Sequence, residues 1–310
     1  MRIAFMGKGG SGKTTLTAAF AQYLAKQEEH ILVLDGDVNV HLGEALKMES
    51  IPLSKNKAEV IEYFEPGRGI PIIGTTPPTS KSRYIRPTAG DEFLKKFSTQ
   101  KGNMSLLTVG TYDEADVGYS CYHGKLSVLE IIFHRLLDQK HEIVIADATA
   151  GIDSLGTSLF FASDVNYFVV EPTLKSIGVY KDFIEVAQDH NLKTFVVANK
   201  VNSEADVMFL KNHIDEEKIV VALPSSDLLR EFEQGDERAM EKFIESQGEA
   251  FERLKKHSEA MNRNWDEYYQ KLLGIYETNC LNWYNSFYDR KLEHEHEAGF
   301  SYEKMMALHI

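Results

Sequence analysis

Short runs of apolar residues alternate with longer stretches of helical spacing along most of this 310-residue chain. Seven runs of four to six residues have the length and composition of buried strands: Ile3–Met6, Ile31–Leu34, Ser105–Val109, Glu142–Ala146, Val165–Val170, Thr194–Ala198 and Lys218–Ala222. Between them, apolar residues recur every three or four positions near 15–27, 125–139, 175–189, 204–213 and 226–233, which predicts helices. This alternation indicates an α/β fold. Because uniformly apolar strands need cover on both faces, we expect a mostly parallel sheet of seven or eight strands between two helical layers.

Two parts of the chain depart from this alternation. The segment 47–103 is irregular and contains most of the prolines and a basic cluster, Lys81, Arg83 and Arg86. We expect it to run over the surface, either as a partner-facing excursion or as a decorative insertion. Beyond the first 237 residues the β-like runs stop, and aromatic residues recur at helical spacing from Trp265 to Tyr288. The chain is therefore predicted to divide into an α/β domain, 1–237, and an all-helical C-terminal extension, 238–310.

The aromatic face of this extension has two open interpretations. It either packs against the α/β domain or forms a surface for a second copy or a partner, since exposed aromatic patches rarely go unused. A helix lying on a membrane is not expected, because its polar face is not basic.

The net charge of the chain narrows the classes of partner that it is expected to bind. The chain has 34 Lys and Arg against 47 Asp and Glu, a formal net charge of −13. Such an acidic protein is poorly suited to bind nucleic acid phosphates or an anionic membrane surface. No apolar run is long enough to cross a bilayer, and the first strand begins too early to leave room for a signal peptide. With only two widely separated cysteines, Cys121 and Cys280, we expect a cytoplasmic protein with reduced thiols.

A glycine-rich loop carries the strongest chemical signal. Gly7-Lys8-Gly9-Gly10-Ser11-Gly12-Lys13-Thr14-Thr15 stands between the first predicted strand and the first predicted helix and fits the P-loop pattern. Its glycines allow successive backbone N–H groups to turn toward a polyphosphate, and the helix N-terminus adds positive potential. Lys13 would reach the terminal phosphates, and the Thr14 hydroxyl would bind Mg²⁺. The chain is predicted to bind a nucleotide.

The additional lysine refines this prediction. The stretch from Lys8 to Thr14 resembles the deviant P-loop ATPases, a group that includes the Min-system and plasmid-partition ATPases and the nitrogenase iron protein. In that family the lysine at the position of Lys8 points across a two-fold interface to the partner's nucleotide. The resemblance therefore implies a homodimer that forms in the ATP state.

Carboxylates follow two of the predicted strands. Asp35 and Asp37 end the second, where parallel strands bring side chains close to bound phosphates. By resemblance these residues belong to switch I, here 35–39, in which Asp37 would position the attacking water and Asp35 would support the Mg²⁺ shell. Val38 departs from the proline common at its position. Asp147 ends the fourth of the apolar runs listed above and is a Walker B candidate for Mg²⁺. The Ala150-Gly151 pair resembles the start of switch II, where backbone N–H groups can follow the γ-phosphate, and switch II here denotes the stretch 150–156.

Two further positions resemble the part of the family site that holds the base. Asn199 follows a predicted strand, where family members use an asparagine to meet adenine, and Pro224 resembles the loop that closes over the base. Together they favour ATP and ADP as ligands. GTP stays open, although Asn202 stands where a guanine-binding Asn-Lys-x-Asp motif has aspartate.

The region around Cys121 indicates a branch of the family. Cys121 lies where the ATPases of carbon monoxide dehydrogenase maturation carry Cys-x-Cys, and the stretch 150–156 also resembles that branch. The match covers roughly residues 1–235. Here His123 replaces the second cysteine, so a thiolate and an imidazole from each of two protomers would form a four-ligand site suited to Zn²⁺ or Ni²⁺. Alternatively, Cys121 is a small apolar residue beside an unrelated histidine. The Glu293–His296 run is better explained as solvated charge.

These observations predict a Mg²⁺-dependent ATPase that acts as a nucleotide-gated homodimer and helps to insert a metal or cofactor into a client protein. Two alternatives remain. One is a positioning or partition ATPase, which the acidic charge disfavours. The other is a nucleotide-dependent interaction module with little turnover, whose aromatic extension recruits a partner.

Overall fold

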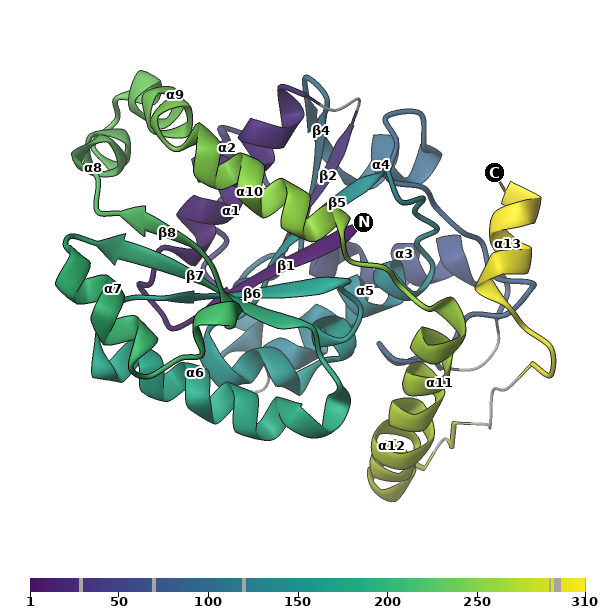
Figure 1. Cartoon of the computed structure of the whole chain (residues 1–310). Coiled ribbons are helices and arrows are strands. Elements are labelled where there is room, and N and C mark those ends of the chain that lie inside the picture. Colours follow the sequence, from purple (N-terminus) through teal and green to yellow (C-terminus); the bar gives the residue numbers. More distant parts are fainter. Residues whose placement is uncertain (28–29, 69–70, 119–120, 290, 293–296, 310) are drawn as a thin grey trace.

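An eight-stranded sheet organises the computed structural model, which describes residues 1–27, 30–68, 71–118, 121–289, 291–292 and 297–309 (Figure 1). The strand order is β3-β4-β2-β5-β1-β6-β7-β8, with β3 antiparallel at one edge and the others parallel. The strands are β1 (Arg2–Gly7), β2 (Ile31–Asp35), β3 (Thr99–Lys101), β4 (Met104–Thr108), β5 (Ile143–Asp147), β6 (Val165–Val170), β7 (Thr194–Val201) and β8 (Ile219–Pro224).

Alternate residues of each central strand enter two separate hydrophobic cores. In β1, Ile3 and Phe5 belong to one core, whereas Ala4 and Met6 belong to the other. The first core includes side chains of α1 (Lys13–Ala25), α2 (Leu42–Leu46), α8 (Asp227–Glu233), α9 (Glu237–Ser246) and α10 (Gly248–Glu259). The second includes side chains of α3 (Lys57–Phe64), α4 (Glu92–Phe97), α5 (Tyr122–His134), α6 (Leu174–Ala187) and α7 (Glu204–Lys211). The predicted α/β fold with helices on both faces is confirmed.

The segment 47–103 is not the surface excursion that its sequence suggests. It contains α3, α4 and β3, and Phe64, Phe93 and Phe97 are buried in the second core. The rings of Phe64 and Phe93 lie 4.9 Å apart, and those of Phe93 and Phe97 lie 4.7 Å apart. Short helices in a segment whose connections contain many prolines show too few apolar repeats to be recognised, although their side chains contribute to packing.

The predicted C-terminal extension divides into parts with different surroundings. Just beyond the predicted boundary, α9 and α10 pack in the same core as α1, and the boundary itself stays a prediction. The predicted aromatic helix is present as α11 (Trp265–Ile275), a π-helical turn (Tyr276–Leu281) and α12 (Asn282–Phe287). Side chains of α11 and of α13 (Tyr302–His309) enter the second core. In α12, by contrast, Trp283 and Phe287 are 55% and 72% exposed.

An ionic cluster fixes the connection between α10 and α11 to the start of the sheet. Arg263 donates to both carboxylate oxygens of Asp138 and of Asp164, at 2.8 to 3.0 Å. Asp138 also accepts from the N-terminal ammonium group and from Arg2. Although burial opposes ionisation, these cations hold the pKa of Asp138 well below its usual value. The helices after α10 are therefore anchored by charge as well as by apolar packing.

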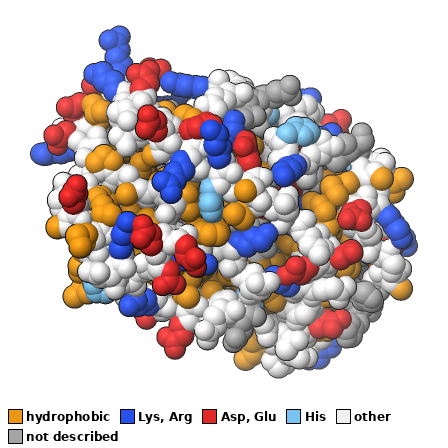
Figure 2. All heavy atoms as spheres, viewed as in Figure 1, with side chains coloured by type: hydrophobic (Ala, Val, Ile, Leu, Met, Phe, Trp, Pro, Cys, Tyr) orange, Lys and Arg blue, Asp and Glu red, His pale blue; other side chains and the backbone are white. Residues whose placement is uncertain are grey.

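None of the helices in the described parts of the chain is long and apolar enough to cross a membrane. On the face drawn in Figure 2, Lys and Arg side chains are scattered among Asp and Glu. The predicted Glu293–His296 charged run lies outside the described residues.

Candidate nucleotide-binding site

The P-loop joins β1 to α1 and depends on glycine where it turns into the helix. Gly12 has φ +92°, and a Cβ there would lie 2.4 Å from the Asn199 side-chain nitrogen. That nitrogen donates a hydrogen bond of 2.8 Å to the Ser11 carbonyl. Asn199, predicted to meet the base, therefore also supports the loop from β7, and any larger residue at Gly12 would displace it.

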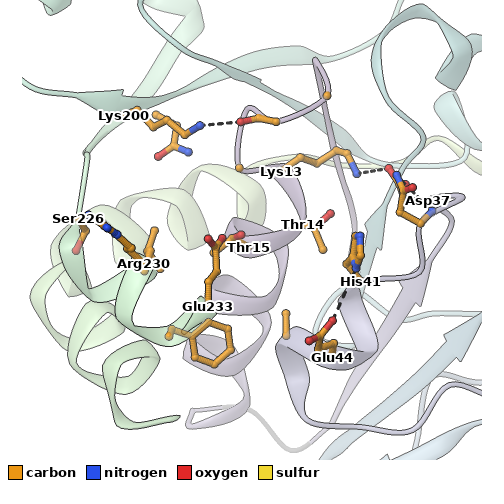
Figure 3. Close-up of a pocket in the computed structure, with 18 of the residues that line it drawn as sticks. Lys13, Thr14, Thr15, Asp37, His41, Glu44, Lys200, Ser226, Arg230 and Glu233 are labelled. Atoms are coloured by element: carbon orange, nitrogen blue, oxygen red, sulfur yellow. Dashed lines mark hydrogen bonds and ion pairs between the residues drawn. The ribbon is translucent and has the colours of Figure 1, made fainter. Parts of the chain in front are cut away.

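Lys13, Thr14 and Asp147 form a compact cluster at the end of the loop. Lys13 Nζ lies 3.0 Å from Asp37 Oδ2 (Figure 3). It also lies 2.6 Å from Asp147 Oδ1, and the Thr14 hydroxyl donates to Asp147 Oδ2 at 2.6 Å. Burial works against the lysine charge, but Asp147 and Asp37 outweigh it and raise the pKa of Lys13. The predicted phosphate-binding lysine is therefore charged and neutralised by carboxylates in the free protein.

Asp35 joins this cluster through the sheet, because it is the register partner of Asp147 across β2 and β5. Its side chain is fully buried. Burial and the neighbouring charge of Asp147 raise the pKa of Asp35 to about 7. A cation placed between these two carboxylates would relieve their repulsion.

The oxygen atoms gathered here fit Mg²⁺, which prefers hydroxyl, carboxylate and water ligands. Thr14, Asp35 and Asp147 supply one hydroxyl and two carboxylates. All three were predicted to serve the metal, and the structure brings them together. Their assignment as Mg²⁺ residues stays a prediction.

The switch I loop holds Asp37 in a closed arrangement. Asp37 Oδ1 accepts 3.0 Å hydrogen bonds from the backbone and the side chain of Asn39, while Oδ2 pairs with Lys13. Next in the chain, Val40 has φ +54°, a conformation that is strained for a β-branched residue. The predicted role of Asp37, to orient a water molecule, would require Lys13 to release its carboxylate.

Lys8 lies at the exposed edge of the loop and pairs within its own chain. Its Nζ donates to the Gly9 carbonyl at 2.9 Å and lies 3.8 Å from a carboxylate oxygen of Glu171, at the end of β6. Lys200 shares this acid, with Nζ 2.7 Å from Glu171 and 2.7 Å from the Gly10 carbonyl. Sequence reasoning singled out neither Glu171 nor Lys200 as a site residue, although Lys200 directly follows Asn199.

A cleft of about 730 Å³ extends from the P-loop between α2 and α8 (Figure 3). Besides predicted residues, among them Gly9, Gly10, Thr15 and Pro224, it is lined by Ser226, two residues after Pro224, and by His41 and Arg230, which no motif indicated. Gly7 and Ser11 belong to the loop but not to the lining. Ala150 lines the cleft, and Gly151 beside it has φ +64° and begins the turn that leads away from Asp147.

Cys121 and His123 lie together at the start of α5, where His123 contacts the switch II segment. Cys121 Sγ is 3.2 Å from His123 Nδ1, and His123 Nε2 is 3.2 Å from Asp153 Oδ1. The histidine packs so closely that a Cβ on Gly156 would meet its ring at 2.2 Å. The hydrogen bond to His123 lowers the pKa of the exposed Cys121 thiol. Within the residues that the structure describes, no three His, Cys, Asp or Glu side chains gather as a metal site, so the predicted pair is incomplete in one chain.

The chain is similar in sequence to a known family of nucleotide-binding domains. Residues 3–239 match the family model of the CobQ/CobB/MinD/ParA nucleotide binding domain. An uncharacterized ATP-binding protein of Methanocaldococcus jannaschii is 32% identical over 220 residues, which cover 70% of this chain and 81% of the relative. The carbon monoxide dehydrogenase accessory protein CooC of Rhodospirillum rubrum is 25% identical over 235 residues, covering 76% of this chain and 87% of CooC.

Solved structures share the architecture at low sequence identity. A ParA family ATPase of Chlorobium tepidum superposes with a TM-score of 0.52 at 14% identity, covering 79% of this chain and 96% of that one. The cell division ATPase MinD of Pyrococcus furiosus gives 0.51 at 17% identity, with 83% and 98% covered. At these identities the likeness concerns the fold alone.

Proposed function

Because this chain belongs to the CobQ/CobB/MinD/ParA family of nucleotide-binding domains, we propose that its ATPase activity operates a homodimeric switch that helps to load a metal or cofactor into a client protein. ATP would join two chains across the face that carries Lys8, and hydrolysis to ADP would release them.

The residues of the cluster have distinct roles in this proposal. Lys13 exchanges its carboxylate partners for the terminal phosphates, and Lys8 leaves Glu171 for the nucleotide of the second chain. Thr14, Asp35 and Asp147 hold Mg²⁺, which neutralises phosphate charge. Asp37, once free of Lys13, orients the attacking water. Such a division of labour suits phosphoryl transfer, in which positioning and charge neutralisation provide most of the catalysis.

The observation that carries the proposed metal role is the contact between His123 and switch II. His123 Nε2 faces Asp153, six residues after Asp147, so the Cys121–His123 pair rests on the segment that leaves the nucleotide site. A histidine whose outer nitrogen is held by a carboxylate is oriented to use its other nitrogen on a metal. Two such pairs facing each other would complete four ligands for Zn²⁺ or Ni²⁺. The similarity to the carbon monoxide dehydrogenase accessory protein CooC also supports the proposed metal role.

Elemental analysis of the ATP-loaded protein, prepared without chelators, tests this role. We expect about one Zn²⁺ or Ni²⁺ for two chains in the parent and none in Cys121→Ser or His123→Ala. Cys280→Ser is the matched control, because the second cysteine belongs to the π-helical turn between α11 and α12 and should leave the metal content unchanged. Parent protein without metal, or metal retained by both variants, would contradict the metal role.

A second candidate function, a nucleotide-dependent interaction module, has its own support. The side chains of Trp283 and Phe287 are mostly exposed and their rings lie 5.6 Å apart on α12. Aromatic clusters of this kind are common at protein interfaces. If Cys121→Ser retains client function while Trp283→Ser loses it, this second function is favoured over metal delivery.

A further inference from the structure

Tyr122, the residue between Cys121 and His123, has a buried hydroxyl with no hydrogen-bond partner among the described residues. It is the first residue of α5, and its side chain is only 6% exposed. Its ring packs edge-on against Tyr112, with centroids 5.9 Å apart. Burying an unpaired hydroxyl costs free energy, and a phenylalanine would fill the same space without that cost. The tyrosine is therefore best explained by a state in which the hydroxyl is paired.

The start of α5 lies beside switch I: a Cβ on Gly36, which stands between Asp35 and Asp37, would lie 3.6 Å from the side chain of Leu126, one helical turn after Tyr122. The carboxylates of switch I are therefore the candidates for that pairing. Burial, followed by the charges of Asp35 and Asp37, raises the pKa of Tyr122, in keeping with a position close to these carboxylates. In the free protein, Asn39 and Lys13 occupy the oxygens of Asp37, and backbone N–H groups of Asp37 and Leu42 lie near those of Asp35. Departure of Lys13 toward phosphate would leave a carboxylate oxygen without its donor.

We propose that Tyr122 is a positioning residue of the ATPase reaction. In the Mg²⁺-ATP state its hydroxyl donates a hydrogen bond to a switch I carboxylate, or to a water held there, and it transmits that state to the flanking Cys121 and His123. This inference rests on the proposed ATPase cycle but does not require that the pair binds a metal.

The local packing explains how a small shift would be transmitted. Cys121 caps α5 in an extended conformation and His123 lies in its first turn, so both side chains move with the helix start. His123 is wedged against Gly156 and Asp153 of switch II. The His123 ring has no free space on the side that faces switch II. Movement of Tyr122 toward switch I would therefore change the 3.2 Å contact between Cys121 and His123.

Tyr122→Phe tests the inference, because it removes only the hydroxyl. Tyr269→Phe is a matched control, since the Tyr269 hydroxyl is also buried and unpaired but belongs to α11. Without nucleotide, both variants should unfold at or above the parental temperature, because neither loses a hydrogen bond. With ATP and Mg²⁺, Tyr122→Phe should lower kcat about tenfold, as expected for one hydrogen bond to a charged group, and leave ADP affinity without Mg²⁺ unchanged. Tyr269→Phe should retain the parental kcat.

A second readout follows Cys121 directly, in proteins that also carry Cys280→Ser. The rate at which dithiobis(nitrobenzoate) modifies Cys121 should differ between ADP and a non-hydrolysable ATP analogue with Mg²⁺. In Tyr122→Phe the two rates should converge. If the parent hydrolyses ATP and Tyr122→Phe keeps both the parental kcat and the nucleotide-dependent difference in modification rate, the role of Tyr122 is overturned while the proposed function stands. A parent that hydrolyses no ATP would overturn the proposed function together with this inference.

Discussion

Lys13 Nζ lies 2.6 Å from Asp147 Oδ1, so the lysine predicted to bind phosphate is paired, in the free protein, with the carboxylate predicted to serve Mg²⁺. Both side chains are buried, and each compensates the charge of the other. Nucleotide and metal can therefore replace this pair together, because phosphate takes the lysine while the cation takes the carboxylate. Neither charge is left unpaired in this arrangement.

Lys13→Ala should abolish nucleotide binding and also destabilise the fold. Removing the lysine leaves Asp37 and Asp147 buried without their cation, a change that typically costs about 3–5 kcal/mol. Calorimetric titration with ADP and unfolding in urea would measure the two effects. Lys26→Ala, which removes an exposed ion pair with Glu241, is the control. It should change neither the ADP affinity nor the unfolding free energy by a measurable amount. Parental ADP affinity in Lys13→Ala would contradict the assignment.

Asp37→Ala should retain ATP binding and slow its cleavage. Loss of the residue that orients water should lower kcat by about 10²-fold or more, while the other phosphate contacts persist. Single-turnover hydrolysis with saturating protein separates the chemical step from binding. Asp206→Ala, a substitution on the outer helix α7, should hydrolyse ATP like the parent. Turnover at the parental rate by Asp37→Ala would refute the role given to this aspartate.

Glu171→Gln should favour the ATP-dependent dimer. The neutral side chain no longer holds Lys8 through charge, so less energy is needed to move that lysine toward a second chain. Because the Lys8–Glu171 pair is partly exposed and 3.8 Å long, we expect only about a two- to fivefold lower dimer dissociation constant. Sedimentation at several protein concentrations would measure it. A dimer weaker than the parental one would mean that Glu171 supports association instead of restraining it.

Arg263→Ala should destabilise the protein most at neutral pH. The folded-state pKa of Asp138 is depressed below its ordinary value of 3.8. Its contribution to stability is therefore present above that value and is lost as pH falls through the lower folded-state pKa. The variant should lose about 3–5 kcal/mol of unfolding free energy near pH 7 and have a smaller deficit near pH 3. Urea unfolding at both values checks this, and a deficit that does not depend on pH would exclude the charge explanation.

The two halves of the aromatic helix should respond differently to truncation. Leu272→Ala, in the buried part of α11, should cost about 2–5 kcal/mol because it leaves a cavity. Trp283→Ala, in the exposed part of α12, should change stability by less than about 0.5 kcal/mol. Thermal unfolding would compare them. A large loss in Trp283→Ala would show that this tryptophan packs against something in solution, and a second copy of the chain would be the first partner to test.

Much of the nucleotide site could be predicted because its residues lie in short stretches at the ends of apolar strands. The P-loop, Asp35 and Asp147 each follow such a strand, and a parallel sheet brings their carboxyl ends to one edge. The pairing of Lys8 and Lys200 with Glu171 could not be predicted, since it joins three strand ends whose order in the sheet is set by tertiary packing. The same is true of Arg263, which lies far along the chain from both of its aspartates.

Periodicity was informative where apolar strands and helices alternate regularly. It identified α1, the helices from α5 to α8 and the apolar strands, but not α3 and α4, where Phe64, Phe93 and Phe97 make aromatic contacts in the core. In the C-terminal extension the helical period was correct, yet sequence alone could not separate the buried α11 from the exposed α12. Both carry aromatic residues at the same spacing, and only the position of the sheet distinguishes them.

The most direct test of the nucleotide-gated switch is the molecular mass of the parent in solution, measured by light scattering with ADP and with a non-hydrolysable ATP analogue, each with Mg²⁺. The account predicts a single chain of 35.2 kDa with ADP and twice that mass with the ATP analogue. Lys8→Ala should remain a single chain in both. The same mass with either nucleotide would contradict the central claim.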